Sequence, residues 1–376
     1  MPLYIGLMSG TSLDGVDGVL VEFDAGGGGG TPRSRAHAHH AFEPSLRDAL
    51  LALNKPGAVD ELHRAALAAN GVAAAYADVV AALCAAADIA PSGIRAIGAH
   101  GQTVRHRPGA DGFGGYTSQL LNGALLAERG GIDVVCDLRS RDLAAGGQGA
   151  PLVPAFHAQC FARPGLAVAV LNVGGIANLS LLPASGGAVL GFDTGPGNAL
   201  MDHWTQVHNG RPFDADGAWA AAGTPDAALL AELLADPYFD LAPPKSTGRD
   251  LFHSRWLQQR LDHQGQGLDA QTVQATLLAL TVRSIVEALR RTAPTTAVLR
   301  VAGGGALNGA LMRALAAELP GVDVASTAAE GVPPDQVEAL AFAWLAHAFI
   351  EGRPGNLPSV TGARGARRLG ALYPTE

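Results

Sequence analysis

Ser9-Gly10-Thr11-Ser12-Leu13-Asp14-Gly15-Val16-Asp17 is the stretch from which the fold of this chain can be worked out. An apolar run, residues 3–8, precedes it, and residues 16–23 follow it with alternating apolar and polar side chains. Alternation with a period of two predicts a strand, and two strands joined by a glycine-bearing turn predict a hairpin. Residues 26–30 and 36–42 are then expected to form the next turn and a third strand.

The turn of this hairpin has the composition of a phosphate-binding loop. Two glycines let the backbone approach a phosphate, and hydroxyls and amides can donate to its oxygens. Two carboxylates could hold a Mg²⁺ ion that bridges phosphates. An ordinary polar hairpin turn explains the segment equally well. The candidate phosphate-binding residues are Gly10, Thr11, Ser12, Leu13, Asp14, Gly15, Val16 and Asp17, and the candidate metal ligands are Asp14 and Asp17.

The pattern of strand, glycine turn and strand starts again near residue 165. Residues 166–172 and 177–182 are apolar runs separated by Gly174-Gly175. This is a weak internal repeat of architecture, because the residues of the two copies do not align closely. Strands alternating with helices, including those expected at 45–53, 59–87, 120–129, 273–291 and 334–350, predict an α/β protein with two sheets.

Two further glycine-rich segments occur near predicted strands. Gly191-Phe192-Asp193-Thr194-Gly195-Pro196-Gly197-Asn198 precedes an expected helix, whose N-terminus favours an anion. An aspartic protease would need a second Asp-Thr/Ser-Gly copy, which the sequence lacks. Residues 303–309 begin with three glycines and suit packing against an adenosine group, although one glycine-rich turn alone is weak evidence. Neither a Walker A nor a Rossmann glycine pattern is present.

Composition excludes several classes of protein. A chain of 376 residues is expected to form two domains, and 48% hydrophobic residues indicate a globular chain. The net charge of −8 argues against a nucleic-acid partner. Three scattered cysteines suggest neither disulfides nor a cysteine-rich metal site. No signal peptide or long uncharged apolar stretch is apparent, so we expect a soluble cytoplasmic protein.

Taken together, the three glycine-rich segments resemble the ATPase core of the actin, hexokinase and Hsp70 superfamily. Within it, the chain is similar to the anhydro-N-acetylmuramic acid kinase family along nearly its whole length. The segments that carry this resemblance are residues 5–17, 99–103, 142–157, 172–178, 191–198 and 331–335. The chain departs from the family pattern at residues 26–30 and 109–115, which we expect to be surface turns.

The resemblance implies a two-domain, actin-like (ribonuclease H-like) α/β fold of mixed sheets flanked by helices, with an interdomain cleft. The expected domains are residues 1–135 with 335–376, carrying the first hairpin, and residues 136–334. It implies ATP and Mg²⁺ as cofactors, an amino sugar as substrate and a homodimer. Additional residues expected to contact the nucleotide are Gly174, Gly195, Gly303, Gly304, Gly305 and Asn308.

The family opens a 1,6-anhydro sugar with water and phosphorylates the released O6. By resemblance Asp193 is the general base for that water, and its place in the second glycine segment agrees. A cation such as Arg139, or the helix start after Pro151, would face the carboxylate of the sugar. The candidate substrate-binding residues are His100, Gln102, Thr103, Arg139, Gln148 and Glu330.

Three alternatives stay open on the residues alone. The chain could be a superfamily kinase for another sugar or small acid, or a nucleotide-driven regulator without catalysis. A regulator has no need of a base such as Asp193. A metal-dependent peptidase-like relative would want clustered histidines, and His100 and His106 only roughly fit that requirement.

Overall fold

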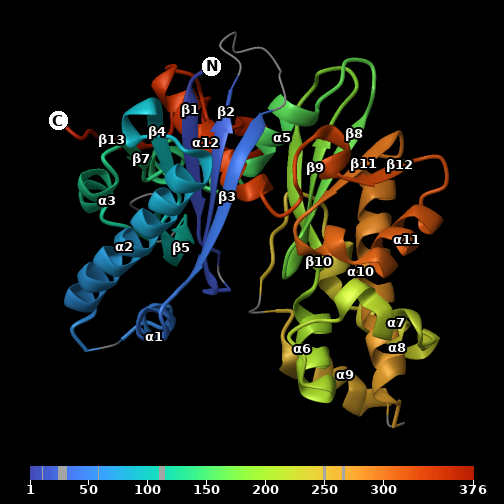
Figure 1. The fold of residues 1–376 in the computed structure, drawn as a ribbon. Coiled ribbons are helices and arrows are strands. Elements are labelled where there is room, and N and C mark those ends of the chain that lie inside the picture. The colour runs from blue at the N-terminus through green and yellow to red at the C-terminus, as the bar shows by residue number, and fades with distance from the viewer. Residues whose placement is uncertain (11, 24–31, 58, 110–114, 249–250, 265–266) are drawn as a thin grey trace. The chain divides into compact units, whose positions relative to one another are not determined.

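A computed structural model describes residues 1–10, 12–23, 32–57, 59–109, 115–248, 251–264 and 267–376. The chain divides into two compact units (Figure 1). Unit 1 consists of Met1–Cys160 and Gln336–Glu376, and unit 2 of Phe161–Asp335. Each unit is built on a mixed β-sheet with helices, so the predicted α/β class with two sheets is confirmed. The turn predicted at residues 26–30 lies outside the described residues.

Unit 1 has a six-stranded sheet in the order β13-β7-β4-β1-β2-β3. The first three strands of the chain pair in antiparallel fashion, and β4 and β7 continue the sheet in parallel with β1. The strands are β1 (Leu3–Met8), β2 (Gly15–Glu22), β3 (Arg33–Ala41), β4 (Ile94–Ala99), β7 (Val134–Cys136) and β13 (Ala371–Tyr373). A separate hairpin joins β5 (Gln102–Pro108) to β6 (Gly115–Leu120).

Helices cover both faces of this sheet. Ile5 and Leu7 of β1 point into a core shared with α2 (Glu61–Ala87). Gly6 faces the opposite side, where α12 (Val337–Ile350) lies on β1 and β4. A Cβ at Gly6 would fall 1.9 Å from the Ala339 carbonyl oxygen, so glycine is needed for the helix to pack this closely. The remaining helices of unit 1 are α1 (Pro44–Leu53), α3 (Gly123–Gly130), α4 (Ser140–Ala144) and α13 (Pro358–Thr361), while α5 (Val153–Phe161) ends in unit 2.

Unit 2 has a five-stranded sheet in the order β10-β9-β8-β11-β12. Its long helix α10 (Ala270–Thr292) packs on β9 and β10. The strands are β8 (Val168–Val173), β9 (Ile176–Leu182), β10 (Leu190–Pro196), β11 (Val298–Ala302) and β12 (Asp323–Ser326). The other helices are α6 (Ala199–Asn209), α7 (Ala218–Ala221), α8 (Ala227–Leu234), α9 (Ser254–Gln264) and α11 (Gly309–Glu318).

The two sheets repeat one strand order. In unit 1 the order β3-β2-β1-β4-β7 has two antiparallel pairs followed by two parallel pairs, and β10-β9-β8-β11-β12 of unit 2 has the same directions. Both predicted hairpins are therefore present. The repeat is one of topology, as the sequence analysis predicted.

Several boundaries differ from the predictions. Residues 136–160, expected in the second domain, belong to unit 1 because β7 pairs with β13 and Gln148 donates its amide to Thr361. The helix expected from residue 120 begins at Gly123, since residues up to Leu120 form β6. Contacts between residues far apart in the sequence therefore set the domain boundary and the start of this helix.

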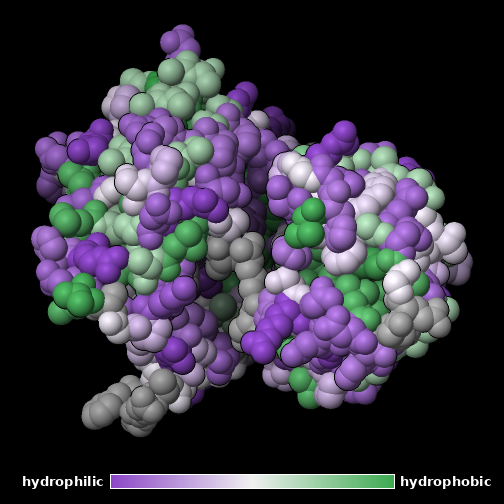
Figure 2. All heavy atoms as spheres, turned by 90° about the horizontal axis from the view of Figure 1, so that it is seen from below, coloured by the Kyte–Doolittle hydropathy of each residue, from purple (hydrophilic) through white to green (hydrophobic). Residues whose placement is uncertain are grey.

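Two helices of the described chain, α2 and α10, are long and apolar enough to cross a membrane by length and composition alone. Each packs on the sheet of its own unit, as a core helix does. The surface turned toward the viewer in Figure 2 is largely polar, with apolar side chains in separate patches.

Candidate active site

The first hairpin turn, between β1 and β2, is held from inside unit 1 by side chains. Ser9 Oγ lies 2.9 Å from the Tyr76 hydroxyl and donates to the Gly101 carbonyl at 3.2 Å. Gln102 Nε2 donates to the Gly10 carbonyl at 3.0 Å. Gln102 is fully buried, and its Oε1 has no hydrogen-bond partner among the described residues. Such an acceptor is suited to a donor on a ligand.

The residues of this turn divide into two groups. The side chains of Leu13 and Val16 are fully buried in the core, so only their backbone could serve a ligand. A Cβ at Gly15 would lie 2.3 Å from the His40 carbonyl oxygen, so this glycine is needed for the hairpin itself. At Gly10 the nearest atom would be Ser12 Oγ at 3.5 Å, an ordinary van der Waals contact, so packing does not require glycine there. Thr11 lies outside the described residues.

The two candidate metal ligands have different surroundings. Asp14 accepts a hydrogen bond from Ser12 Oγ at 2.7 Å. Asp17 Oδ1 lies 2.9 Å from His39 Nδ1 and 3.6 Å from His37 Nε2. Burial acts to raise the pKa of Asp17, but the hydrogen bonds from the two imidazoles lower it overall. Among the described residues no group of three or more His, Cys, Asp or Glu side chains forms a metal site.

His100 and Arg139 lie together beneath the same turn. Arg139 Nη2 and Nε lie 2.9 and 3.2 Å from His100 Nε2, and His100 Nδ1 lies 3.3 Å from the Ser9 carbonyl oxygen. Burial, and then the charge of Arg139, hold the pKa of His100 well below its usual value. The side chains of His100 and Arg139 are thus held by hydrogen bonds to other groups of the protein.

The other predicted substrate residues of unit 1 are less closely connected. Thr103 Oγ1 accepts a hydrogen bond from Gln119 at 3.1 Å. Gln148 donates its backbone amide to the Thr361 carbonyl at 2.8 Å and leaves an exposed side chain.

Glu338, in the first turn of α12, is a candidate that sequence reasoning missed. Although Glu338 is exposed to solvent, the protein atoms around its carboxyl raise its pKa; the charge of Arg139 acts to lower this pKa and the charge of Asp17 to raise it. Arg139, whose own pKa burial lowers to about 10, is stabilised as a cation by Glu338 and Asp142. Glu338 therefore belongs electrostatically to this cluster. Its sequence signal was only an acidic residue at the start of a helix.

Asp193 lies within β10 (Leu190–Pro196), so most of the second glycine-rich segment is itself a strand. The strand register shifts between Asp193 and Gly195. Asp193 Oδ2 accepts the Thr247 amide at 2.9 Å, and the Asp193 carbonyl accepts the Tyr238 hydroxyl at 2.8 Å. Lys245 lies over the Tyr238 ring and accepts the Asp193 amide on its carbonyl at 3.1 Å.

This setting makes the Asp193 carboxyl a weaker acid than an ordinary aspartate. Burial raises its pKa to about 6, against the opposing effects of the Thr247 amide and the Lys245 charge. Thr247 Oγ1 is buried and has no hydrogen-bond partner among the residues that the structure describes. A half-buried carboxylate with a pKa near neutrality, beside an available hydroxyl, is suited to general base catalysis. Tyr238, Lys245 and Thr247 were not predicted, because only folding brings them to β10.

The second hairpin turn, Gly174-Gly175, is held by backbone hydrogen bonds. The amides of Gly197 and Asn198 donate to the carbonyls of Gly175 and Gly174 at 2.9 and 2.8 Å. Gly195 packs under Phe239, since a Cβ there would lie 2.7 Å from its ring. The second glycine segment is thus fitted against the second hairpin.

The third glycine segment serves partly for packing. A Cβ at Gly303 or Gly305 would lie 2.5 Å from Asn172 Oδ1 or 2.4 Å from Val173. Asn308 caps α11 by accepting the Leu311 amide at 3.0 Å. Gly304 instead lines a cavity of about 280 Å³ in unit 2, whose lining also includes Asn198, Asp202, Phe213, Asp214, Asp216, Leu307 and Asn308.

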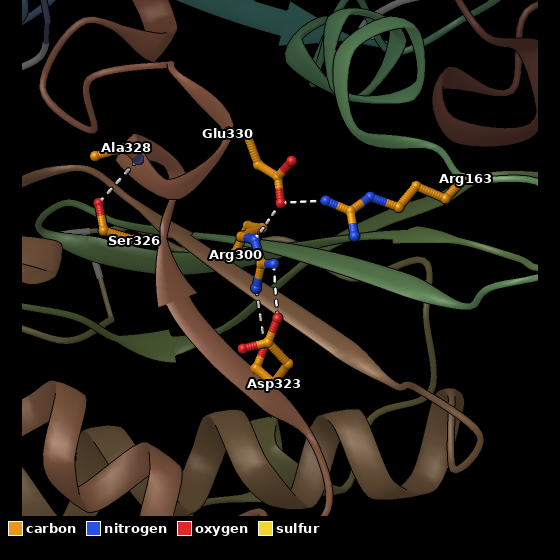
Figure 3. Close-up of polar contacts among 6 residues, drawn as sticks. All are labelled: Arg163, Arg300, Asp323, Ser326, Ala328 and Glu330. Atoms are coloured by element: carbon orange, nitrogen blue, oxygen red, sulfur yellow. Dashed lines mark hydrogen bonds and ion pairs between the residues drawn. The ribbon is translucent and has the colours of Figure 1, made fainter.

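Glu330, predicted to contact substrate, has two guanidinium partners (Figure 3). Its carboxylate accepts from Arg300 Nε at 2.7 Å and also pairs with Arg163. Arg300 in turn pairs with Asp323 at 2.7 Å. Although burial acts to raise the pKa of Glu330, the hydrogen bonds from the two arginines lower it. The geometry assigns this carboxylate to an ion-pair network between β11 and the segment after β12.

The repeated sheet topology, the turn of polar residues between β1 and β2 and the carboxylate on β10 define a two-unit α/β protein of the ribonuclease H-like class. The family model for anhydro-N-acetylmuramic acid kinase matches residues 2–375. The chain therefore belongs to the anhydro-N-acetylmuramic acid kinase family.

Relatives of that name match over nearly their whole length. One from Variovorax paradoxus is 58% identical over 376 residues, covering 99% of both chains. One from Bordetella avium is 57% identical over 372 residues, covering 99% of this chain and 96% of the relative. Among solved structures, the activator of 2-hydroxyisocaproyl-CoA dehydratase from Clostridium difficile has a TM-score of 0.48 at 12% identity, over 93% of this chain and 96% of that chain.

Proposed function

We propose that this chain is an anhydro-N-acetylmuramic acid kinase that uses ATP to convert 1,6-anhydro-N-acetylmuramic acid into N-acetylmuramic acid 6-phosphate and ADP. The match to relatives of that name along the whole chain carries the proposal. Water attacks C1 of the sugar, the C1–O6 bond breaks, and O6 takes the γ-phosphoryl group. This is a step in the recycling of cell-wall sugars, and we place it in the cytoplasm.

Asp193 is the general base in this proposal. Its carboxylate takes the proton of the attacking water, which requires the ionised form and hence a pH above about 6. The Thr247 amide on Oδ2 orients the carboxylate, and the unpartnered Thr247 hydroxyl can hold the water or a sugar hydroxyl. Bond cleavage leaves the negative charge on O6, so its attack on phosphorus needs no second base.

The β1–β2 turn binds the phosphates of ATP through backbone amides and the Ser12 hydroxyl. Mg²⁺ would neutralise charge on the transferred phosphoryl group, with Asp14 and Asp17 as its protein ligands. The exposed Asp14 carboxylate fits a hard cation. Asp17 already pairs with His37 and His39, so it fits only where those imidazoles release it or share it with a Mg²⁺-bound water.

The remaining assignments follow from the described surroundings. Gly304 and its cavity are proposed to take the adenosine, with Gly174, Gly195, Gly303, Gly305 and Asn308 shaping that region. Gln102, with its free Oε1, and Thr103 and Gln148 are proposed as contacts for the sugar. We also propose a homodimer, which light scattering after size exclusion would test.

The decisive experiment incubates the purified protein with ATP, Mg²⁺ and the anhydro sugar in ¹⁸O-labelled water. We expect ¹⁸O at C1 and phosphate on O6 in the product, measured by mass spectrometry. Turnover of a plain hexose with no reaction of the anhydro sugar would instead support a kinase for a different sugar.

A further inference from the structure

A chain of buried and partly buried polar contacts runs through unit 1 from the first hairpin turn to the C-terminal segment. It begins at the Ser9 carbonyl, which faces His100 Nδ1 at 3.3 Å. His100 Nε2 faces the Arg139 guanidinium, whose Nη1 donates to the Gly149 carbonyl at 2.9 Å. These contacts link the turn to the glycine-rich loop that follows α4.

Asp142 closes this chain at its other end. Its carboxylate is fully buried and accepts the Gly149 amide at 2.8 Å, Asn356 Nδ2 at 2.6 Å and Thr361 Oγ1 at 2.8 Å. A buried carboxylate with three donors is well satisfied and holds its partners in fixed places. Gly149 is thus bonded on both its amide and its carbonyl, by Asp142 and Arg139.

Arg139 decides which nitrogen of His100 carries the proton. A guanidinium only donates hydrogen bonds, so His100 Nε2 must present its lone pair. The imidazole is neutral at pH 7, because burial and the charge of Arg139 depress its pKa. The one proton of the neutral ring is therefore on Nδ1, where it donates to the Ser9 carbonyl.

The direction of the Ser9 carbonyl decides the direction of the next amide. In a trans peptide the C=O and the following N–H point to opposite sides. With the Ser9 oxygen turned inward to His100, the Gly10 N–H is turned outward. Gly10 itself is partly exposed at this turn. A partly exposed amide that points away from the core is a donor for an anion.

We propose that His100 is a positioning residue that directs the Gly10 amide to a terminal phosphate of the nucleotide, and that Arg139 and Asp142 fix its tautomer and orientation. This deepens the proposed function and rests on its nucleotide part. It gives His100 and Arg139 a different role from the sugar contact that the sequence analysis expected.

The test measures how much the phosphates add to nucleotide affinity. Calorimetric titration with AMP, ADP and the non-hydrolysable analogue AMP-PNP gives this gain for the wild-type protein and for His100→Leu and His100→Asn. Leucine removes the donor, whereas the asparagine amide can take the place of Nδ1–H. In His100→Leu we expect the preference for ADP over AMP to fall about tenfold, while the affinity for AMP stays unchanged. In His100→Asn most of the preference should remain.

Two results would overturn the proposal. One is an equal loss of AMP and ADP affinity in His100→Leu; the other is an Asn variant as impaired as the Leu variant. If His100→Leu does not fold, as judged by thermal unfolding, Asp142→Asn replaces it and should lose about fivefold of the same preference. An unchanged preference in that variant contradicts the role of Asp142. Because no sugar is present, failure of the sugar assignment is detected separately by the ¹⁸O experiment.

Discussion

The first hairpin of each unit occupies the same place in the same sheet topology, yet the two turns are built differently. The turn of unit 1 spans Ser9–Asp14, whereas that of unit 2 consists of Gly174 and Gly175. Side chains of His100 and Gln102 hold the carbonyls of the longer turn, and backbone amides of Gly197 and Asn198 hold those of the shorter one. The long turn can therefore surround an anion, while the short one is a support for its neighbours.

The third strands differ in the same sense. Strand β3 alternates between partly buried and exposed residues and presents His37 and His39 to Asp17. Strand β10 is mostly buried toward its end and has the register shift at which Asp193 is held. One scaffold thus supports the proposed phosphate contact in unit 1 and a carboxylate of raised pKa in unit 2.

The largest effect that would sharpen this comparison is expected at Asp193. Asp193→Asn should reduce kcat by about 10²–10⁴-fold, because the base is lost, and leave the Kd for ADP unchanged. The raised pKa means that Asp193 favours folding below about pH 4 and loses this contribution as the pH rises through about 6. The variant should thus be more stable than wild type at pH 7, by about 1–2 kcal/mol in urea unfolding. Full activity would remove Asp193 from the mechanism.

The next effect concerns the packing of unit 1. Gly6→Ala should lower the free energy of unfolding by about 2–3 kcal/mol, because its Cβ would fall on the backbone of α12. Gly187→Ala in unit 2 is the matched control, since its Cβ would meet only ordinary contacts from 3.4 Å. Equal unfolding curves for the two variants would show that α12 can shift away from β1.

A smaller effect is expected from pH. For the wild-type enzyme, kcat/KM should fall about tenfold per pH unit below about pH 6, as Asp193 takes up a proton. Lys245→Met should move this limb to higher pH, because the Lys245 charge lowers the pKa of Asp193. An unmoved limb would assign the titration to another group.

The smallest effect is expected at Glu330. Glu330→Gln should cost about 1 kcal/mol of stability through its weakened pairs with Arg300 and Arg163, and leave the KM for the sugar within about twofold of wild type. Arg300→Lys should cost a similar amount, since Lys cannot bond both carboxylates in one plane. A large rise in the sugar KM for Glu330→Gln alone would restore the substrate role predicted from sequence.

The parts of the molecule that could be predicted are those encoded locally. Both hairpins follow from apolar runs around glycine turns, and Asp193 stands out because its glycine-rich segment is distinctive. The partners of Asp193 could not be found this way: Tyr238, Lys245 and Thr247 are far along the chain and have no motif. Glu338 and Asp142 were missed for the same reason, since a lone acidic residue acquires its meaning only from the partners that folding brings to it.

Helix α12 packs on Gly6 of β1 and also on Gly98 of β4, where a Cβ would lie 2.0 Å from the Phe342 carbonyl oxygen, and this has a consequence for how the protein is made. Unit 2 is one continuous stretch, Phe161–Asp335, so every strand of its sheet is translated before residue 336. Unit 1 needs residues 336–376 to cover its glycine pair, satisfy Asp142 and pair with β7. We therefore expect unit 1, most of which is translated first, to finish folding last, and to expose until then the apolar sheet surface that α12 covers.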